Sequence, residues 1–138
     1  MEYIIGVGLA LLIAVFAAFV GFDRDRAFYP TVLIVIASYY VLFAAIGESA
    51  QAAIAEVMGM TVFLLMAIAG FKINPWWTVL GLFAHGLFDF NHELFVDNPG
   101  MPAWWPAFCG SIDVVAAAVL GLLLWRRAER PAQVGATT

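Results

Sequence analysis

The chain has 138 residues, of which 64% are hydrophobic and only 12% are charged. Soluble domains average about 25% charged residues, so this composition excludes a water-soluble globule and indicates a protein that crosses a membrane several times. Six Lys and Arg residues stand against ten Asp and Glu residues and form no basic stripe, which excludes nucleic acid as a partner. The single cysteine, Cys109, excludes an internal disulfide.

Charged and turn-forming residues divide the chain into five apolar stretches, each close to the ~20 residues that a helix needs to cross a bilayer. These stretches predict transmembrane helices over residues 3–22, 28–46, 50–71, 75–95 and 106–125. The expected fold is therefore all-α, a polytopic membrane helix bundle that forms one domain over residues 1–127. Residues 128–138 are expected to be a flexible cytoplasmic tail.

The basic residues set the expected orientation, because Lys and Arg are retained on the cytoplasmic side of a membrane. With five spans, all the basic residues fall on one side of the bilayer: Arg24, Arg26, Lys72, Arg126, Arg127 and Arg130. We therefore predict an N-terminus outside the cell and a cytoplasmic C-terminus.

Ionisable side chains interrupt three of the predicted spans. His85, Asp89 and His92 follow one another at i, i+4 and i+7, which places them on one face of a helix. Glu56 and Asp113 lie well inside two other apolar stretches. A charged group at the bilayer centre costs about 2.5–3.5 kcal/mol on insertion scales, so each needs a partner or a function. Helix rise puts all five at about 5–15 Å below the outer end of their spans, which predicts one cluster in the outer half of the membrane.

Imidazole nitrogen and carboxylate oxygen are ligands that zinc, iron and manganese share, so the cluster predicts a divalent metal ion, with zinc favoured. The predicted ligands are His85, Asp89, His92, Asp113 and Glu56. His85 and His92 lie about 10.5 Å apart along the helix axis. Either both histidines bind one ion, or the site holds two ions, or one histidine is a ligand and the other supports a ligand. Glu56 or Asp89 is the expected catalytic general base.

Three neighbouring features are also assigned. Cys109, one turn before Asp113, is either a soft additional ligand or a small buried residue. Tyr39 and Tyr40 lie mid-span, where a hydroxyl needs an acceptor, so one of them is expected to contact the cluster. The segment 98–106, with its two tryptophans, is expected to form a lid at the outer interface.

The stretch 82–92, followed by a Pro-rich turn and then by Cys109 and Asp113, resembles a family of small bacterial integral membrane proteins of unknown function. That family has an H-x-G-x-x-D-x-x-H-like helix after a helix that bears a Glu, which Glu56 matches. The resemblance implies a bacterial plasma membrane and supplies no activity. The chain also resembles, more loosely, intramembrane zinc hydrolases of the ceramidase and adiponectin-receptor type, which combine His and Asp residues from several helices. The full motif set of those enzymes is absent from this sequence.

These observations predict a metal-dependent hydrolase that acts on a lipid or other apolar substrate. One alternative is a proton- or ion-coupled binding or transport protein in which the same groups titrate. Another is a non-catalytic subunit of a membrane complex that uses one His to hold a pigment or haem. His–carboxylate pairs that only hold helices together are a third. The lipid bilayer is the expected partner, and a homo-oligomer is left open.

Overall fold

The computed structural model describes residues 1–129, and every regular element in that part of the chain is a helix. The helices are α1 (Glu2–Val20), α2 (Phe28–Ile46), α3 (Ala50–Lys72), α4 (Trp76–Phe90) and α5 (Trp105–Glu129), with short 3-10 turns η1 (Phe22–Arg24) and η2 (His92–Leu94). The predicted all-α bundle is thus confirmed.

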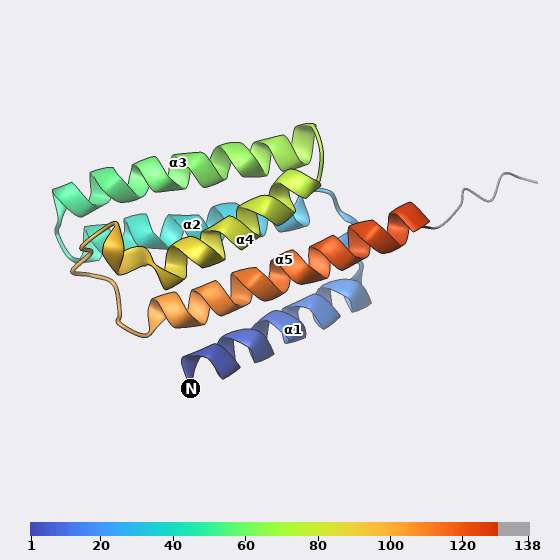
Figure 1. Ribbon diagram of the computed structural model, residues 1–138, viewed down its shortest axis with the longest axis horizontal. Helices are drawn as coiled ribbons and strands as arrows, with labels where there is room; N and C mark the ends of the chain where they lie inside the picture. Colours follow the sequence, from blue (N-terminus) through green and yellow to red (C-terminus); the bar gives the residue numbers. More distant parts are fainter. Residues whose placement is uncertain (130–138) are drawn as a thin grey trace, which may run out of the picture.

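The five helices lie side by side, with α3 at one edge of the bundle and α1 at the other (Figure 1). Helix α4 packs on α3 and α5, α2 packs on α3, and α1 packs chiefly on α5. The buried residues of α1 are all small, namely Gly6, Ala10 and Ala17. A Cβ at Gly6 would collide with the carbonyl oxygen of Phe108 on α5. Small residues therefore let α1 approach α5 closely, as at many helix contacts in membranes.

Four helices, α1, α2, α3 and α5, are long and apolar enough to cross a membrane. Their outer faces expose large hydrophobic side chains, such as Phe19, Leu42 and Leu65, which suits contact with lipid. Helix α4 has 15 residues, or about 22 Å at 1.5 Å per residue, whereas a hydrocarbon core is about 30 Å thick. The described chain is therefore a membrane-type bundle of four helices of spanning length and one shorter helix.

Two helix ends differ slightly from the prediction. Helix α1 ends at Val20 because Gly21 takes a left-handed conformation with φ of 94°, a common way to end a helix. Helix α5 continues to Glu129, beyond the predicted end at residue 125, through residues that favour helix. The first two residues of the predicted tail are therefore helical, and residues 130–138 lie outside the described residues.

The largest correction concerns α4, which was predicted to run to residue 95 and ends at Phe90. The Asn91 side chain folds back and donates from Nδ2 to the carbonyl oxygen of Leu87 at 2.8 Å. Such local bonds let Asn compete with helix continuation. The chain then turns into η2. His92 was predicted to lie on the same continuous helix as His85 and Asp89, and this part of the prediction is wrong. His92 is nevertheless buried.

The segment between η2 and α5 folds back over the end of α2. A Cβ at Gly100 would collide with the carbonyl oxygen of Phe43 and the amide nitrogen of Gly47. Only glycine permits backbones to meet this closely. The ring of Trp105, where α5 begins, lies 4.9 Å from the ring of Phe43. These contacts hold the segment against the bundle, and Asn98, which belongs to the segment, is buried.

Candidate metal centre

Helices α4 and α5 meet at a pair of glycines. A Cβ at Gly86 would lie 3.0 Å from the carbonyl oxygen of Gly110 and 3.2 Å from the Cβ of Asp113, which is closer than most side chains allow. The absence of a side chain at Gly86 therefore lets the two helices approach. This approach brings His85 and Asp89 of α4 against Asp113 of α5.

His85, Asp89 and Asp113 form the tightest group of ionisable residues, here called the three-residue centre. His85 Nδ1 lies 2.6 Å from Asp113 Oδ2 and 3.4 Å from Asp89 Oδ1. One ligand atom from each residue lies within 4.8 Å of the other two. All three side chains are 1% exposed or less. One nitrogen and two oxygens in this arrangement could hold a metal ion.

Two carboxylate oxygens of the centre have no hydrogen-bond partner among the described residues. They are Asp89 Oδ2 and Asp113 Oδ1, and both are buried. A buried acceptor without a partner is rare and costly, so each requires a cation, a proton or a water molecule. A divalent cation would satisfy both oxygens at once, and the residues present therefore fit a metal ion.

Tyr40 of α2 joins the centre to the rest of the polar residues. Its hydroxyl donates to Asp89 Oδ1 at 2.7 Å, and its ring stacks on the His92 imidazole with centroids 4.3 Å apart. The prediction that one of the two tyrosines contacts the cluster is confirmed. Tyr39 lies instead against Trp105, with ring centroids 5.0 Å apart. A hydrogen bond such as that from the Tyr40 hydroxyl to Asp89 Oδ1 fixes the orientation of a carboxylate that could bind a metal ion.

Glu56 of α3 and His92 of η2 form a second buried unit, the Glu56–His92 pair. His92 Nε2 donates to Glu56 Oε1 at 2.8 Å. The Asn98 side chain donates from Nδ2 to the same oxygen at 2.8 Å and to the Tyr40 carbonyl oxygen at 3.0 Å. His92 Nδ1 has no partner among residues 1–129, so its lone pair is free when the imidazole is neutral.

The structure thus brings all five predicted residues together and divides them into two units. Glu56 and His92 are bonded to each other, and neither is a member of the three-residue centre. Cys109 is buried on α5 but is likewise not a member of that group. His85 and His92 therefore belong to separate units that Tyr40 bridges.

Asn98 is a member of the site that the sequence did not predict. The segment 98–106 was predicted to form a lid at the outer interface, whereas Asn98 is buried and hydrogen-bonds to Glu56 and to the backbone of Tyr40. An Asn-Pro-Gly run predicts a turn, and turns usually lie at the surface. The only available signal was Gly100, which marks a close backbone approach without showing where the amide would point.

The chemistry open to these residues follows from their charge and surroundings. Three buried carboxyl groups and two imidazoles carry excess negative charge unless protons or a cation offset it. The Phe63 ring lies edge-on to His85, with centroids 4.6 Å apart, and gives the centre an apolar wall. The group can therefore bind a cation or pass protons.

No family model, curated protein or solved structure matches the chain.

Proposed function

We propose that this membrane protein is a metal-dependent hydrolase in which His85, Asp89 and Asp113 bind the ion. The observation that carries the proposal is the convergence of three buried ligand atoms, together with two carboxylate oxygens that have no partner among the described residues. Zinc is the first choice, and iron and manganese accept the same ligands.

The number of ligands favours catalysis over a structural role. Structural zinc sites use four protein ligands, whereas catalytic sites use three and keep one position for water or substrate. A bound ion would supply a Lewis acid and an activated water. The proton that His85 Nδ1 now shares with Asp113 Oδ2 has to leave when the nitrogen becomes a ligand. Metal uptake is therefore expected to release a proton and to strengthen as pH rises.

Glu56 is the proposed proton acceptor for the reaction, with Asp89 as the alternative. His92 and Asn98 both hydrogen-bond to Glu56 Oε1 and so hold this carboxylate. A cavity of about 240 Å³ is lined by Ala52 and Ala55, on the same helix as Glu56, and by the residues on either side of Asn98. In this proposal, water approaches the pair from this cavity, although Glu56 and His92 themselves do not line it.

The proposed substrate is a lipid or another apolar molecule. The helices that surround the centre expose apolar side chains to the bilayer, so a lipid reaches the protein without leaving the membrane. In this proposal the centre lies in the outer half of the membrane, because the basic residues are expected on the cytoplasmic side. The bacterial plasma membrane is proposed from the family resemblance alone. The proposed bond is an ester or an amide, because a bound ion would polarise a carbonyl group and supply an activated water.

Metal analysis by plasma mass spectrometry tests the proposal on detergent-purified protein. The wild type is expected to carry close to one zinc, iron or manganese per chain, and His85→Gln and Asp113→Asn to carry almost none. His92→Gln is the matched control, because it alters a buried imidazole outside the three-residue centre. Hydrolysis of lipid esters and amides should disappear with the metal. A folded wild type that contains no metal and takes up none would contradict the proposal.

That contradicting result would favour proton coupling, the second candidate. Its support is a set of short contacts between ionisable or hydroxyl groups of four helices and η2: His85 to Asp113 at 2.6 Å, Tyr40 to Asp89 at 2.7 Å and His92 to Glu56 at 2.8 Å. Short hydrogen bonds between such groups suit proton relays in membranes. A metal-free protein that carries protons across liposomes, and stops doing so in Asp89→Asn, would support it.

A further inference from the structure

A second polar cavity lies at the opposite end of the bundle from the metal centre. It has a volume of about 270 Å³, and its lining residues come from η1 and the turn after it, the start of α2, the end of α3, the start of α4 and the end of α5. Figure 1 shows these ends of the labelled helices at one end of the bundle. The residues of the three-residue centre and of the Glu56–His92 pair are not among its lining residues. The cavity therefore needs an explanation of its own.

Three residues that line this cavity each carry a buried side-chain oxygen with no hydrogen-bond partner within the described residues: Tyr29 OH, Thr78 Oγ1 and Asp23 Oδ1. Tyr29 and Thr78 are only 6% and 1% exposed. Each hydroxyl has a proton to donate, whereas an ionised carboxylate can only accept. Buried polar atoms without partners are uncommon, so their presence in one cavity points to a ligand that supplies them.

The charges around the cavity call for a ligand that carries both signs. Three arginines, including Arg127, and two aspartates, including Asp23, line it. Arg127 Nη2 donates to the Asp23 carbonyl oxygen at 3.1 Å and lies 3.8 Å from Asp23 Oδ2. That contact leaves Asp23 Oδ1 free to accept from elsewhere. Guanidinium and hydroxyl groups suit a phosphate, and the free carboxylate oxygen suits a primary ammonium.

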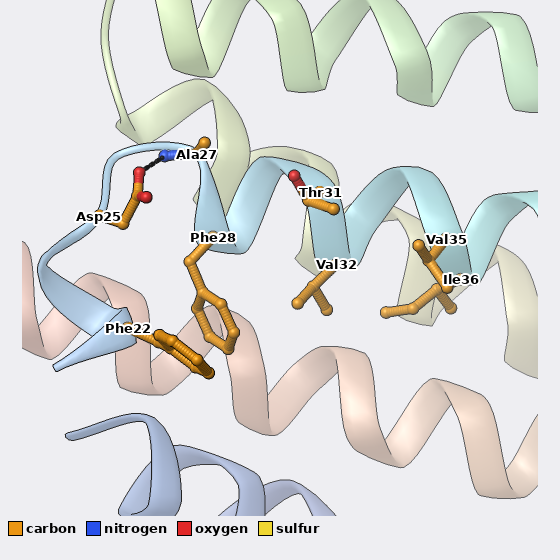
Figure 2. Close-up of a pocket in the computed structure, with 8 residues that line it drawn as sticks. All are labelled: Phe22, Asp25, Ala27, Phe28, Thr31, Val32, Val35 and Ile36. Carbon is orange, nitrogen blue, oxygen red and sulfur yellow. Dashed lines mark hydrogen bonds between the residues drawn. The ribbon is translucent and has the colours of Figure 1, made fainter. Parts of the chain in front are cut away.

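An apolar groove continues from the cavity along the membrane-spanning part of α2. It has a volume of about 420 Å³, and Figure 2 shows Phe22 and Phe28 at its start and Val32 and Ile36 farther along the helix. Asp25 lines both the groove and the cavity, so the two adjoin. A headgroup in the cavity could therefore place an acyl chain in the groove, which favours a lipid over a soluble ligand.

We propose that this end of the bundle binds a phospholipid whose headgroup carries a phosphate and a primary ammonium. The hydroxyls of Tyr29 and Thr78 and the guanidinium of Arg127 donate to the phosphate, and the ammonium donates to Asp23 Oδ1. The site is independent of the metal centre and of the reaction proposed there, because the two share no residue.

Native mass spectrometry of the detergent-purified full chain tests this site. The protein is titrated with phosphatidylethanolamine, phosphatidylcholine and phosphatidylglycerol of identical acyl chains, and with soluble glycerophosphoethanolamine. Phosphatidylethanolamine should bind most tightly, because a trimethylammonium has no N–H to donate and phosphatidylglycerol has no cation. Tyr29→Phe and Thr78→Val should each weaken its binding by roughly two- to tenfold, the value of one hydrogen bond. Asp23→Asn should bring phosphatidylethanolamine and phosphatidylcholine close together.

Lys72→Gln is the matched control, since it removes a cation at the same end of the bundle that does not line the cavity, and its lipid binding should equal that of the wild type. Equal binding of the three lipids to the wild type would overturn the proposal, and this arm needs no variant. Glycerophosphoethanolamine that binds as tightly as the lipid would overturn the assignment to a lipid. Hydroxyl removal that raises the melting temperature without changing lipid binding would show that these oxygens have no ligand.

Discussion

The two buried polar units of this bundle are built in different ways. The three-residue centre lies wholly on α4 and α5, and Gly86 allows the helix contact that creates it. The Glu56–His92 pair combines a helical residue with one from η2, and Asn98 reaches it from an irregular segment. One unit therefore depends on helix packing and the other on how the chain folds after α4 ends.

The units also differ in which buried atoms lack a partner. In the pair, Glu56 Oε1 accepts from two donors, both at 2.8 Å, and the buried atom without a partner among the described residues is a nitrogen, His92 Nδ1. In the centre, two carboxylate oxygens, Asp89 Oδ2 and Asp113 Oδ1, accept from no described residue. Two anionic oxygens without partners have more capacity for a cation than one imidazole nitrogen. The comparison therefore favours the centre as the place where an ion binds.

Asp113→Asn is expected to have the largest effect on this comparison. The amide keeps the shape of the carboxylate but loses its charge, and it would place an N–H₂ group where an ion needs an oxygen. Loss of a residue that only supports a ligand costs 10–100-fold in metal affinity, so loss of a ligand should cost more than about 100-fold. Equilibrium dialysis with zinc measures this. Asp97→Asn, at an exposed aspartate, is the control and should bind as the wild type does; equal affinities of the two variants would refute the assignment.

Tyr40→Phe is expected to have the next largest effect. The variant removes the hydroxyl that donates to Asp89 Oδ1 and keeps the ring that stacks on His92. Metal affinity should fall roughly 10–100-fold, as it does when a residue that orients a ligand is removed. The same dialysis experiment applies, with Tyr39→Phe as the matched control. Unchanged affinity in Tyr40→Phe would mean that Asp89 does not need this bond to bind.

The parts of the site that could be predicted from sequence are those that depend on helix periodicity. His85 and Asp89 are one turn apart, and such residues share a face in any helix. Helix rise then brings Asp113 of a neighbouring span to a similar depth. The close contact of His85 with both aspartates agrees with that reasoning. Apolar stretches of spanning length fixed the positions of the four long helices in the same way.

The remaining parts depend on contacts that no local pattern encodes. The sequence predicts a helix through residue 95, yet a side-chain bond from Asn91 ends α4 at Phe90. His92 reaches Glu56 only because the chain turns there. Asn98 is buried because Gly100 lets a loop lie directly on α2. Each of these is a tertiary contact that prevails over a local preference.

Asn98→Ala is expected to lower the free energy of unfolding of the protein more than it lowers the affinity for zinc. It removes the donor to Glu56 Oε1 and to the Tyr40 carbonyl oxygen, both in buried surroundings. A buried acceptor that loses its hydrogen-bond donor lowers the free energy of unfolding by about 1–3 kcal/mol. Denaturant titration in mixed micelles measures this cost. Zinc affinity should change less than in Tyr40→Phe, because the centre keeps its three ligands. A loss of zinc equal to that of Asp113→Asn would show that the pair belongs to the metal site.

Asn91→Ala is expected to have the smallest effect, about 0.5–1.5 kcal/mol for one hydrogen bond. Its bond to the Leu87 carbonyl oxygen is exposed, yet that bond ends α4 and so determines where His92 points. If the turn and the pair form one unit, a double-mutant cycle with His92→Gln should give a coupling energy above about 0.5 kcal/mol. Additive effects would mean that the pair holds the turn in place without help from Asn91. The residue that ends the helix would then be His92, through its bond to Glu56.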